Sequence, residues 1–383
     1  MSNPPRKDPP QRDPSVIAVL HRSGGRWHAL VAATGARRPR IIDTRAFDTV
    51  EATLEPWLEE HSAGSVIRIV PASGVICRNC SLPDVPPDQL EQTLQLQAEA
   101  HLLGPAPEHR LATAALPLGP DETTRSGLIA AWPEATRVDM PEVHRPVQYA
   151  PDIAAVAAVI DRTRPEEPVV WCDPETGAIA LALVHAKGVE FRATREDAAD
   201  REHWLRSVRR VVTETGLHAG HSEDFVLQLA DLTERQLADH AADRPAFLLP
   251  PDIRHALVGR LDNAPDDPAW WSTHGIAAGV LLARTGEMAN LTTMLAEPPA
   301  AETGLLARSV DALSRPRVAT AIAVAAVLVL AFGPLLFSRL HLAVLRARFG
   351  DLEERLGRLE QVEHQVLMYK ELEQQVWPVT KIL

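Results

Sequence analysis

The sequence predicts an α/β body followed by a membrane span and an exposed helix, and three observations support this prediction. Two comparable series of short apolar strands and amphipathic helices follow one another between residues 15 and 297. An uncharged apolar run comes next, at 318–337, and it is long enough to cross a bilayer. Beyond it, apolar residues recur at spacings of three and four within 338–383, as in a coiled coil.

Composition narrows the class of protein. The 383 residues predict two to three structural units at about 150 residues per domain. With 45% hydrophobic and 23% charged residues, the chain is not disordered throughout. Its 51 acidic and 39 basic residues give a net charge of −12, which argues against nucleic acid as a partner. Three cysteines, Cys77, Cys80 and Cys172, indicate a reducing compartment.

The first series makes up a lobe at 15–164. Residues 1–14 precede it, and their prolines predict a disordered N-terminus. The lobe alternates apolar runs of strand length with longer runs of helical spacing. We expect strands at 16–20, 27–32, 66–71, 74–80, 112–116 and 127–131, and helices at 50–61, 88–103 and 151–162.

The second series makes up a lobe at 165–297, and a linker at 298–317 comes after it. Its pattern of strands and helices resembles that of the first lobe, which predicts a duplicated α/β architecture. We expect strands at 169–171, 178–185, 189–194 and 225–229, and helices at 197–215 and 232–242.

The run at 318–337 is predicted to be a transmembrane helix. At about 1.5 Å per residue it spans about 30 Å, the thickness of the hydrocarbon core. Arg315, Arg317 and Arg339 flank it as interfacial anchors would. A buried helix of a large soluble domain is the alternative. Arginines are balanced across the run, but the N-terminus has no signal peptide, so we expect a cytoplasmic body and an external tail.

The tail at 338–383 is predicted to be one amphipathic helix outside the membrane. Acid-then-base pairs four residues apart, such as Asp351 with Arg355, support an exposed helical face. Its apolar stripe needs a partner, which is a homodimer, a second subunit, or a later domain of the same chain. The predicted interface comprises Leu345, Phe349, Leu352, Leu356, Leu359, Val362, Val366 and Tyr369.

The second lobe carries the motif of a known family. It opens Val-Val-Trp-Cys-Asp-Pro-Glu-Thr-Gly at 169–177, continues Ala-Ile-Ala-Leu-Ala-Leu-Val, and ends Val-Glu-Phe-Arg-Ala-Thr-Arg at 189–195. This stretch resembles the second phosphate-binding hairpin of actin-like ATPases. It is most similar to the branch formed by the PilM/GspL platform proteins of type IV pilus and type II secretion systems.

Four further stretches agree with that family. The motif Ser-Leu-Pro-Asp-Val-Pro at 81–86, with the helix after it, resembles the family's insertion subdomain, here about 81–145. The run at 149–156 resembles its link between lobes, and 273–283 resembles its late helix near the adenine site. Ala-Asn-Leu at 289–291 resembles the motif that ends the cytoplasmic part of L-type members.

The resemblance implies a fold and a role. The fold would be a duplicated, actin-like (RNase H-like) domain of two lobes, followed by one transmembrane helix and a coiled-coil-like helix. The protein would be a single-pass scaffold of the bacterial inner membrane. Its implied partners are the secretion or pilus assembly ATPase, a second bitopic subunit and a polytopic platform membrane protein.

The resemblance also locates a degenerate nucleotide site. Ser23, Gly24 and Gly25 would form the first phosphate turn, and Asp173, Thr176 and Gly177 the second. Leu20 stands about where active members carry an acid, and a second acid at Glu175 would repel a phosphate. We therefore expect no ATP hydrolysis. ATP with Mg²⁺ remains the ligand to test, and a membrane-tethered, active actin-like ATPase is the alternative.

Other chemistry has weaker support. Cys77 and Cys80 have the spacing of a redox or zinc site, but a strand would point them to opposite faces. His218 and His221, with acids at 223–224, fit a solvated turn better than a metal site. The Trp270-Trp271 pair favours packing between lobes over a binding platform.

Overall fold

The computed structural model describes most of the N-terminal body. The described residues are 13–299 without 49–52, 84–85, 102–105, 121, 198–199 and 239–244, together with Met368 and Lys370. The chain divides into two compact units, Met1–Pro299 and Ala300–Leu383. The predicted span at 318–337 and the eight predicted interface positions of the tail lie outside the described residues. Among the helices that are described, none is long and apolar enough to cross a bilayer.

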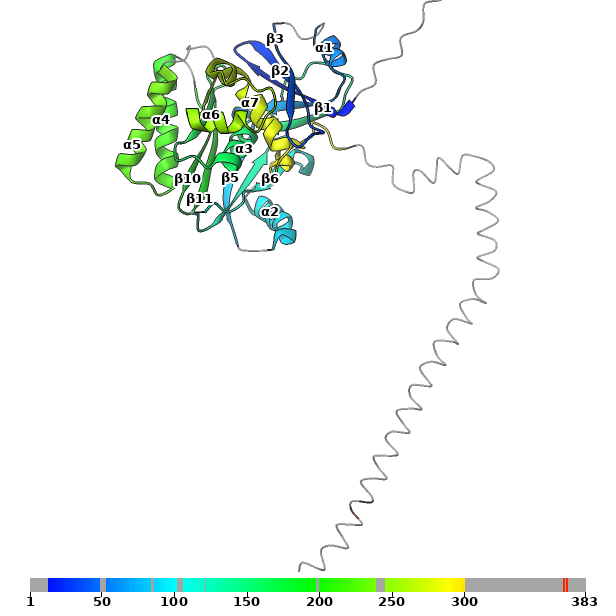
Figure 1. The fold of residues 1–383 in the computed structure, drawn as a ribbon. Helices are drawn as coiled ribbons and strands as arrows, with labels where there is room; N and C mark the ends of the chain where they lie inside the picture. Colours follow the sequence, from blue (N-terminus) through cyan, green and yellow to red (C-terminus); the bar gives the residue numbers. More distant parts are fainter. Residues whose placement is uncertain are drawn as a thin grey trace, which may run out of the picture. The chain divides into compact units, whose positions relative to one another are not determined.

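The first lobe is a five-stranded sheet in the order β3-β2-β1-β4-β8, coloured blue to cyan in Figure 1. Strands β1, β2 and β3 form an antiparallel meander, and β4 and β8 run parallel to β1. The elements are β1 (Asp13–Ser23), β2 (Arg26–Ala33), β3 (Arg40–Phe47), α1 (Leu54–Glu60), β4 (Ala63–Val70), β8 (Val147–Pro151) and α3 (Ile153–Thr163).

The central strand β1 is buried on both faces. Ile17 and Val19 belong to the core that the two lobes share, whereas Ala18 and Leu20 belong to a second core under α1. This separation results from the alternation of side chains along a strand. Each neighbouring pair of residues on β1 therefore faces two different parts of the molecule.

A small subdomain is inserted between β4 and β8. Its three strands form an antiparallel sheet in the order β5-β7-β6, and its helix packs on one face. The first strand begins at Ile76, earlier than the 81 expected for the insertion. The elements are a 3₁₀ turn at Ala72–Gly74, β5 (Ile76–Leu82), α2 (Pro87–His101), a 3₁₀ turn at Glu108–Arg110, β6 (Leu111–Ala115) and β7 (Arg125–Ala131).

The second lobe repeats the meander of the first in a sheet of order β11-β10-β9-β12. A mixed α/β fold with two similar sheets is thus confirmed. The elements are β9 (Val169–Asp173), β10 (Ala178–His185), β11 (Gly188–Arg195), α4 (Arg201–His218), α5 (Glu223–Ala238), β12 (Ala246–Leu248), α6 (Pro251–Val258), α7 (Pro268–Arg284) and a 3₁₀ turn at Ala289–Thr292.

The strand predicted at 225–229 was wrong, because these residues lie within helix α5. Five residues are too few to distinguish a buried strand from a helix. The pattern extends to buried Val226, Leu229, Ala230, Thr233 and Leu237, which share one helical face. The helix predicted at 232–242 is the second half of α5, whose described part ends at Ala238.

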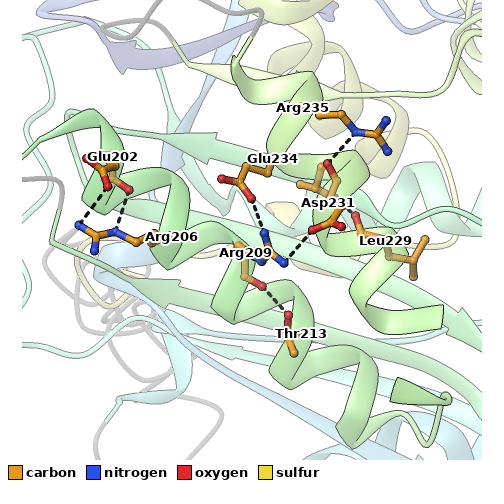
Figure 2. A network of polar contacts seen from close by, with 9 residues as sticks. Glu202, Arg206, Arg209, Thr213, Leu229, Asp231, Glu234 and Arg235 are labelled. Atoms are coloured by element: carbon orange, nitrogen blue, oxygen red, sulfur yellow. Dashed lines mark hydrogen bonds and ion pairs between the residues drawn. The ribbon is translucent and has the colours of Figure 1, made fainter. Parts of the chain in front are cut away.

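Helices α4 and α5 form an antiparallel hairpin on the second lobe (Figures 1 and 2). Across it, Arg209 contacts Asp231 at 2.8 Å and Glu234 at 2.9 Å. Two helices bring the chain back to the end of the sheet from which it left. Strand β12 consequently enters antiparallel to β9, whereas β4 is parallel to β1.

Helices α3 and α7 join the two lobes. Eight consecutive residues of α3, from Ile153 to Ile160, are buried. The two helices cross closely at Gly279, where an added Cβ would lie 2.6 Å from Ala155 Cβ. Both helices contribute to the largest apolar cluster, which also takes in side chains from both sheets. The lobes are therefore parts of one folded body.

Candidate functional site

The predicted site residues come from two tight turns, one in each lobe. Gly24 and Gly25 connect β1 to β2 with φ angles of 58° and 70°. Two successive left-handed residues define the hairpin turn for which glycine is favoured. Gly177 ends the β9–β10 turn with a φ of 66°, and an added Cβ there would lie 2.2 Å from the Glu196 carbonyl oxygen. Glycine is required at both places, but the second is also crowded.

The structure brings these two turns together through Glu175. The backbone N–H of Gly25 donates a hydrogen bond to Glu175 Oε2 at 2.6 Å. Ser23 and Asp173 are buried beside this contact. In a phosphate-binding turn, such a backbone N–H would donate to the ligand. Here the Gly25 N–H donates to the Glu175 carboxylate of the same chain instead. Sequence reasoning identified Glu175 only as a source of repulsion and missed that it bonds the opposite turn.

Asp173 stabilises its own turn. Its Oδ1 accepts the Glu175 N–H at 3.1 Å and its Oδ2 accepts the Thr176 hydroxyl at 3.2 Å. Burial raises the pKa of Asp173 to about 6, against the lowering effect of these bonds. Ser23 also lowers this pKa from the other turn, although its buried hydroxyl lies outside regular hydrogen-bond geometry. Both carboxylate oxygens of Asp173 thus accept hydrogen bonds that stabilise the β9–β10 turn.

Asp152, at the start of α3, is a second buried acid that was missed as a site residue. Its Oδ2 accepts the Ala72 N–H at 2.7 Å, whereas its buried Oδ1 has no hydrogen-bond partner in the described part of the chain. Burial, with a smaller contribution from the charge of Asp173, raises the pKa of Asp152 to about 7. The two carboxyls are close enough to influence each other's protonation. The sequence signal was its position in the link between lobes, at 149–156.

His21, and not Leu20, faces the second lobe from β1. Leu20 packs in the core under α1, on the opposite face of the strand. The His21 ring stacks on His28 at a centroid distance of 4.9 Å and lies edge-on to Trp171 of β9 at 6.2 Å. Burial lowers the pKa of His21 well below its ordinary value, so the ring is neutral at neutral pH. The residue of β1 that faces the second lobe here is therefore a neutral ring and not a carboxylate.

These residues do not fit ATP with Mg²⁺ as they are arranged. The Gly25 N–H is bonded to Glu175, Ser23 is buried, and the first hairpin contributes no carboxylate. Among the described residues, no group of three or more His, Cys, Asp or Glu is placed to hold a metal ion. The arrangement joins the lobes through polar contacts of the chain itself.

The two close cysteines lie on opposite faces of β5. Cys77 packs toward the shared core and Cys80 toward the core of the insertion. Burial raises the pKa of Cys77 to about 12 and that of Cys80 to about 11, so both thiols stay protonated. Their surroundings are those of packing residues.

The histidines near the α4–α5 turn point to different partners. His218 Nε2 is 3.7 Å from Glu190 Oε1, whereas the His221 ring packs on Phe225 at 4.9 Å. Of the tryptophan pair, Trp271 is buried and donates its indole N–H to the Pro265 carbonyl at 2.8 Å. Trp270 packs against His274 at 5.5 Å. Both tryptophans thus serve packing on α7.

Comparison with known proteins gives matches among solved structures alone. No family model matches the chain, and no curated protein matches it. The chain is 15% identical to the cytoplasmic domain of EpsL, an inner-membrane component of the type II secretion system of Vibrio cholerae, over 52% of this chain and 75% of that one, with a TM-score of 0.29. It is 13% identical to the PilM–PilN type IV pilus biogenesis complex, over 70% and 85%, with a TM-score of 0.32.

A third similar structure is a Bacteroides thetaiotaomicron protein of unknown function with an actin-like ATPase fold. It is 9% identical over 52% of this chain and 77% of that one, with a TM-score of 0.29. Solved structures that resemble this chain thus include members of the family that the motifs predict. At these identities and TM-scores, neither a role nor a residue assignment is transferred from them.

Proposed function

We propose that the chain is a bitopic inner-membrane scaffold of a type II secretion or type IV pilus assembly platform. The observation that supports this most directly is the bond from the Gly25 N–H to Glu175 Oε2, which joins the two turns. A body whose turns are closed by its own carboxylate keeps its shape without nucleotide. Such a body suits docking better than turnover, and we propose that it does not hydrolyse ATP.

The proposed role divides the chain into three functional parts. The body at 15–297 lies in the cytoplasm and docks the assembly ATPase. The run at 318–337 anchors it in the membrane beside a polytopic platform protein, and the helix at 338–383 pairs with a second bitopic subunit or with its own copy. The shared core of α3 and α7 supports this role, because a docking body must transmit force without coming apart.

Fractionation and co-purification test the scaffold. The full chain, tagged at its N-terminus and expressed in its own host, should sediment with membranes and co-purify with the assembly ATPase and a bitopic subunit. Leu328→Arg with Leu330→Arg should release it from membranes, since arginine at a helix centre costs about 2.5–3.5 kcal/mol on the insertion scale. Leu328→Ala with Leu330→Ala is the matched control. A wild-type chain in the supernatant would contradict the anchor, and purification without either partner would contradict the platform role.

An active membrane-tethered ATPase is the second candidate, because two buried carboxyls, Asp152 and Asp173, lie near one another. Paired acids can take a divalent cation when both are ionised. Phosphate release from ATP with Mg²⁺ should be at background in the wild type. Turnover that Asp152→Asn and Asp173→Asn each abolish would establish the enzyme instead.

A further inference from the structure

A cavity of about 420 Å³ is formed where four connecting segments of the chain meet. They are the loop between β6 and β7, the link after α3, the turn between β10 and β11, and the α4–α5 turn with the start of α5. The volume lies in the range of about 300–1,000 Å³ that is usual for small-molecule sites. No lining residue belongs to the Ser23–Gly25 or Asp173–Gly177 turn, so this cavity is separate from the predicted nucleotide site.

A buried carboxylate from the β6–β7 loop lines this cavity. Glu122 is 8% exposed, and its Oε2 accepts the Gly119 N–H at 3.0 Å. Glycine at 119 permits this contact, because an added Cβ would lie 2.7 Å from Glu122 Oε1. Oε1 itself is buried and has no hydrogen-bond donor in the described part of the chain. The fold thus holds a carboxylate at the cavity with one of its two oxygens unused.

A guanidinium from the link between the lobes lies next to this carboxylate. Arg164 Nε is 3.5 Å from Glu122 Oε1, an ion pair without hydrogen-bond geometry. Nη2 donates to the Pro117 carbonyl, whereas Nη1 is buried and has no acceptor among the described residues. Arg164 has a φ of 45°, a left-handed conformation that is unfavourable for a residue with a side chain. The chain thus tolerates backbone strain at the residue that supplies the guanidinium.

The pair leaves one acceptor and one donor unused, and both belong to side chains that line the cavity. Buried polar atoms without partners are unfavourable, so a ligand that supplies a donor and an acceptor would be stabilised there. An α-amino acid carries both on one carbon, as an ammonium and a carboxylate. The ammonium can donate to Glu122 Oε1, and the carboxylate can accept from Arg164 Nη1.

The remaining lining selects the side chain of the ligand. Glu122 and Glu166 with Arg164 give 1 − 2 = −1 when histidine is counted as neutral, which favours a ligand of charge +1. Glu166 is exposed, and the Phe225 ring is 37% exposed, so both remain open to contact. A long aliphatic stem can pack on such a ring while its cationic head stays near a carboxylate.

We propose that this cavity binds a free α-amino acid with a long cationic side chain, of the lysine type. The α-ammonium bonds Glu122, the α-carboxylate bonds Arg164, and the side chain lies along Phe225 toward Glu166. The ligand connects the insertion, the link between the lobes and the second lobe, since segments of all three line the cavity. The assignment does not rest on the scaffold role, because it uses neither the membrane run nor the two turns.

Titration calorimetry of the full chain in detergent tests the proposal with three ligands. L-Lysine should bind the wild type. Nα-acetyl-L-lysine lacks the α-ammonium and should bind at least about tenfold more weakly, because a hydrogen bond between charged groups is lost. L-Norleucine has the same stem without the cationic head. It should bind about threefold more weakly, since the contact that it lacks is with an exposed carboxylate.

Three substitutions test the same contacts from the side of the protein. Glu122→Gln should weaken lysine binding at least about tenfold. Phe225→Ala should weaken lysine and norleucine alike, about threefold, through the lost ring contact. Glu166→Gln should weaken lysine and leave norleucine unchanged. Leu227→Ala, exposed on the same helix and outside the lining, is the control for Phe225, and Glu202→Gln, exposed on α4, is the control for Glu166.

The absence of binding at millimolar lysine would overturn the proposal, because water alone would then satisfy the unused atoms. Equal affinity for lysine and its acetylated form would exclude the α-ammonium contact and overturn it as well. Norleucine binding as tightly as lysine would overturn the assignment of a cationic side chain. If Glu122→Gln fails to fold, the acetylated ligand still tests the same contact in the wild type.

Discussion

The two lobes share their first three strands and differ in the elements that come after these strands. Both sheets order the three as a meander whose first hairpin holds a tight glycine turn. In the first lobe a single crossover helix, α1, leads to β4, parallel to β1. In the second, the α4–α5 hairpin leads to β12, antiparallel to β9. The parts that position the turns are therefore alike, and the lobes diverge on their outer surfaces.

The largest expected difference lies between the two turns. Gly177→Ala should cost about 3 kcal/mol of unfolding free energy, because it adds a steric overlap to the left-handed backbone. Gly25→Ala meets nothing within 4 Å and should cost about 1 kcal/mol from backbone strain alone. Chemical denaturation of both full-length variants measures this. Equal losses would mean that the second turn yields to accommodate the side chain.

The two buried acids should differ in how they couple stability to pH. The folded pKa of Asp152, about 7, lies above the ordinary 3.8, so its stabilising contribution is complete below pH 4 and is lost as pH rises through 7. Asp152→Asn should therefore flatten the decline between pH 4 and 7 and add about 2 kcal/mol at pH 8.

Asp173→Asn is the comparison for that experiment. Asp173, with a pKa of about 6, should show the same sign over a narrower range. Its side chain also accepts two bonds within its turn, so the substitution should stabilise less. Unfolding curves recorded at four pH values distinguish the two. Parallel pH profiles for wild type and Asp152→Asn would show that this carboxyl is not coupled to folding.

The junction of the lobes should tolerate no added methyl group at Gly279. Gly279→Ala places a Cβ 2.6 Å from Ala155 Cβ, and we expect a loss of about 1.5 kcal/mol from overpacking. Gly259→Ala is the matched control, since its Cβ meets the Ala256 carbonyl oxygen at an ordinary 3.4 Å. Thermal unfolding should show one transition in both variants. Two transitions in Gly279→Ala would mean that the lobes fold separately.

The smallest effect should come from the surface of the second lobe. Arg209, shown in Figure 2, bridges α4 to Asp231 and Glu234 of α5, but all three side chains are partly exposed. Arg209→Ala should cost under about 1 kcal/mol, and the loss should shrink at high salt. Arg206→Ala, which removes a contact within α4 alone, should cost less still. A salt-independent loss would indicate packing of the arginine stem.

The sequence was a good guide where periodicity extended over many residues. The meander strands around 16–20 and 178–185 were predicted because burial on both faces gives them uniform apolar runs. Strand β3 was missed because charged and polar residues, Arg45 among them, fill its exposed face. Strand β12 has only three residues, too few for any pattern.

The candidate site was predictable in its turns and not in its contacts. Glycines at 24, 25 and 177 stand in short turns between apolar runs, where a left-handed residue is expected. The bond between Gly25 and Glu175 joins residues 150 positions apart, and the raised pKa of Asp152 depends on burial by several elements. Properties of this kind arise from packing between lobes, on which local pattern carries no information.

Helix α3 has a mechanical consequence. Its residues Ile153 to Ile160 are all buried and apolar. The helix therefore has no polar face that could stay in contact with water if the lobes were pulled apart. Exposing it would lose the burial of eight apolar side chains at once. Under tension, the molecule should consequently resist as a single stiff unit until it yields all at once, instead of opening gradually along a seam.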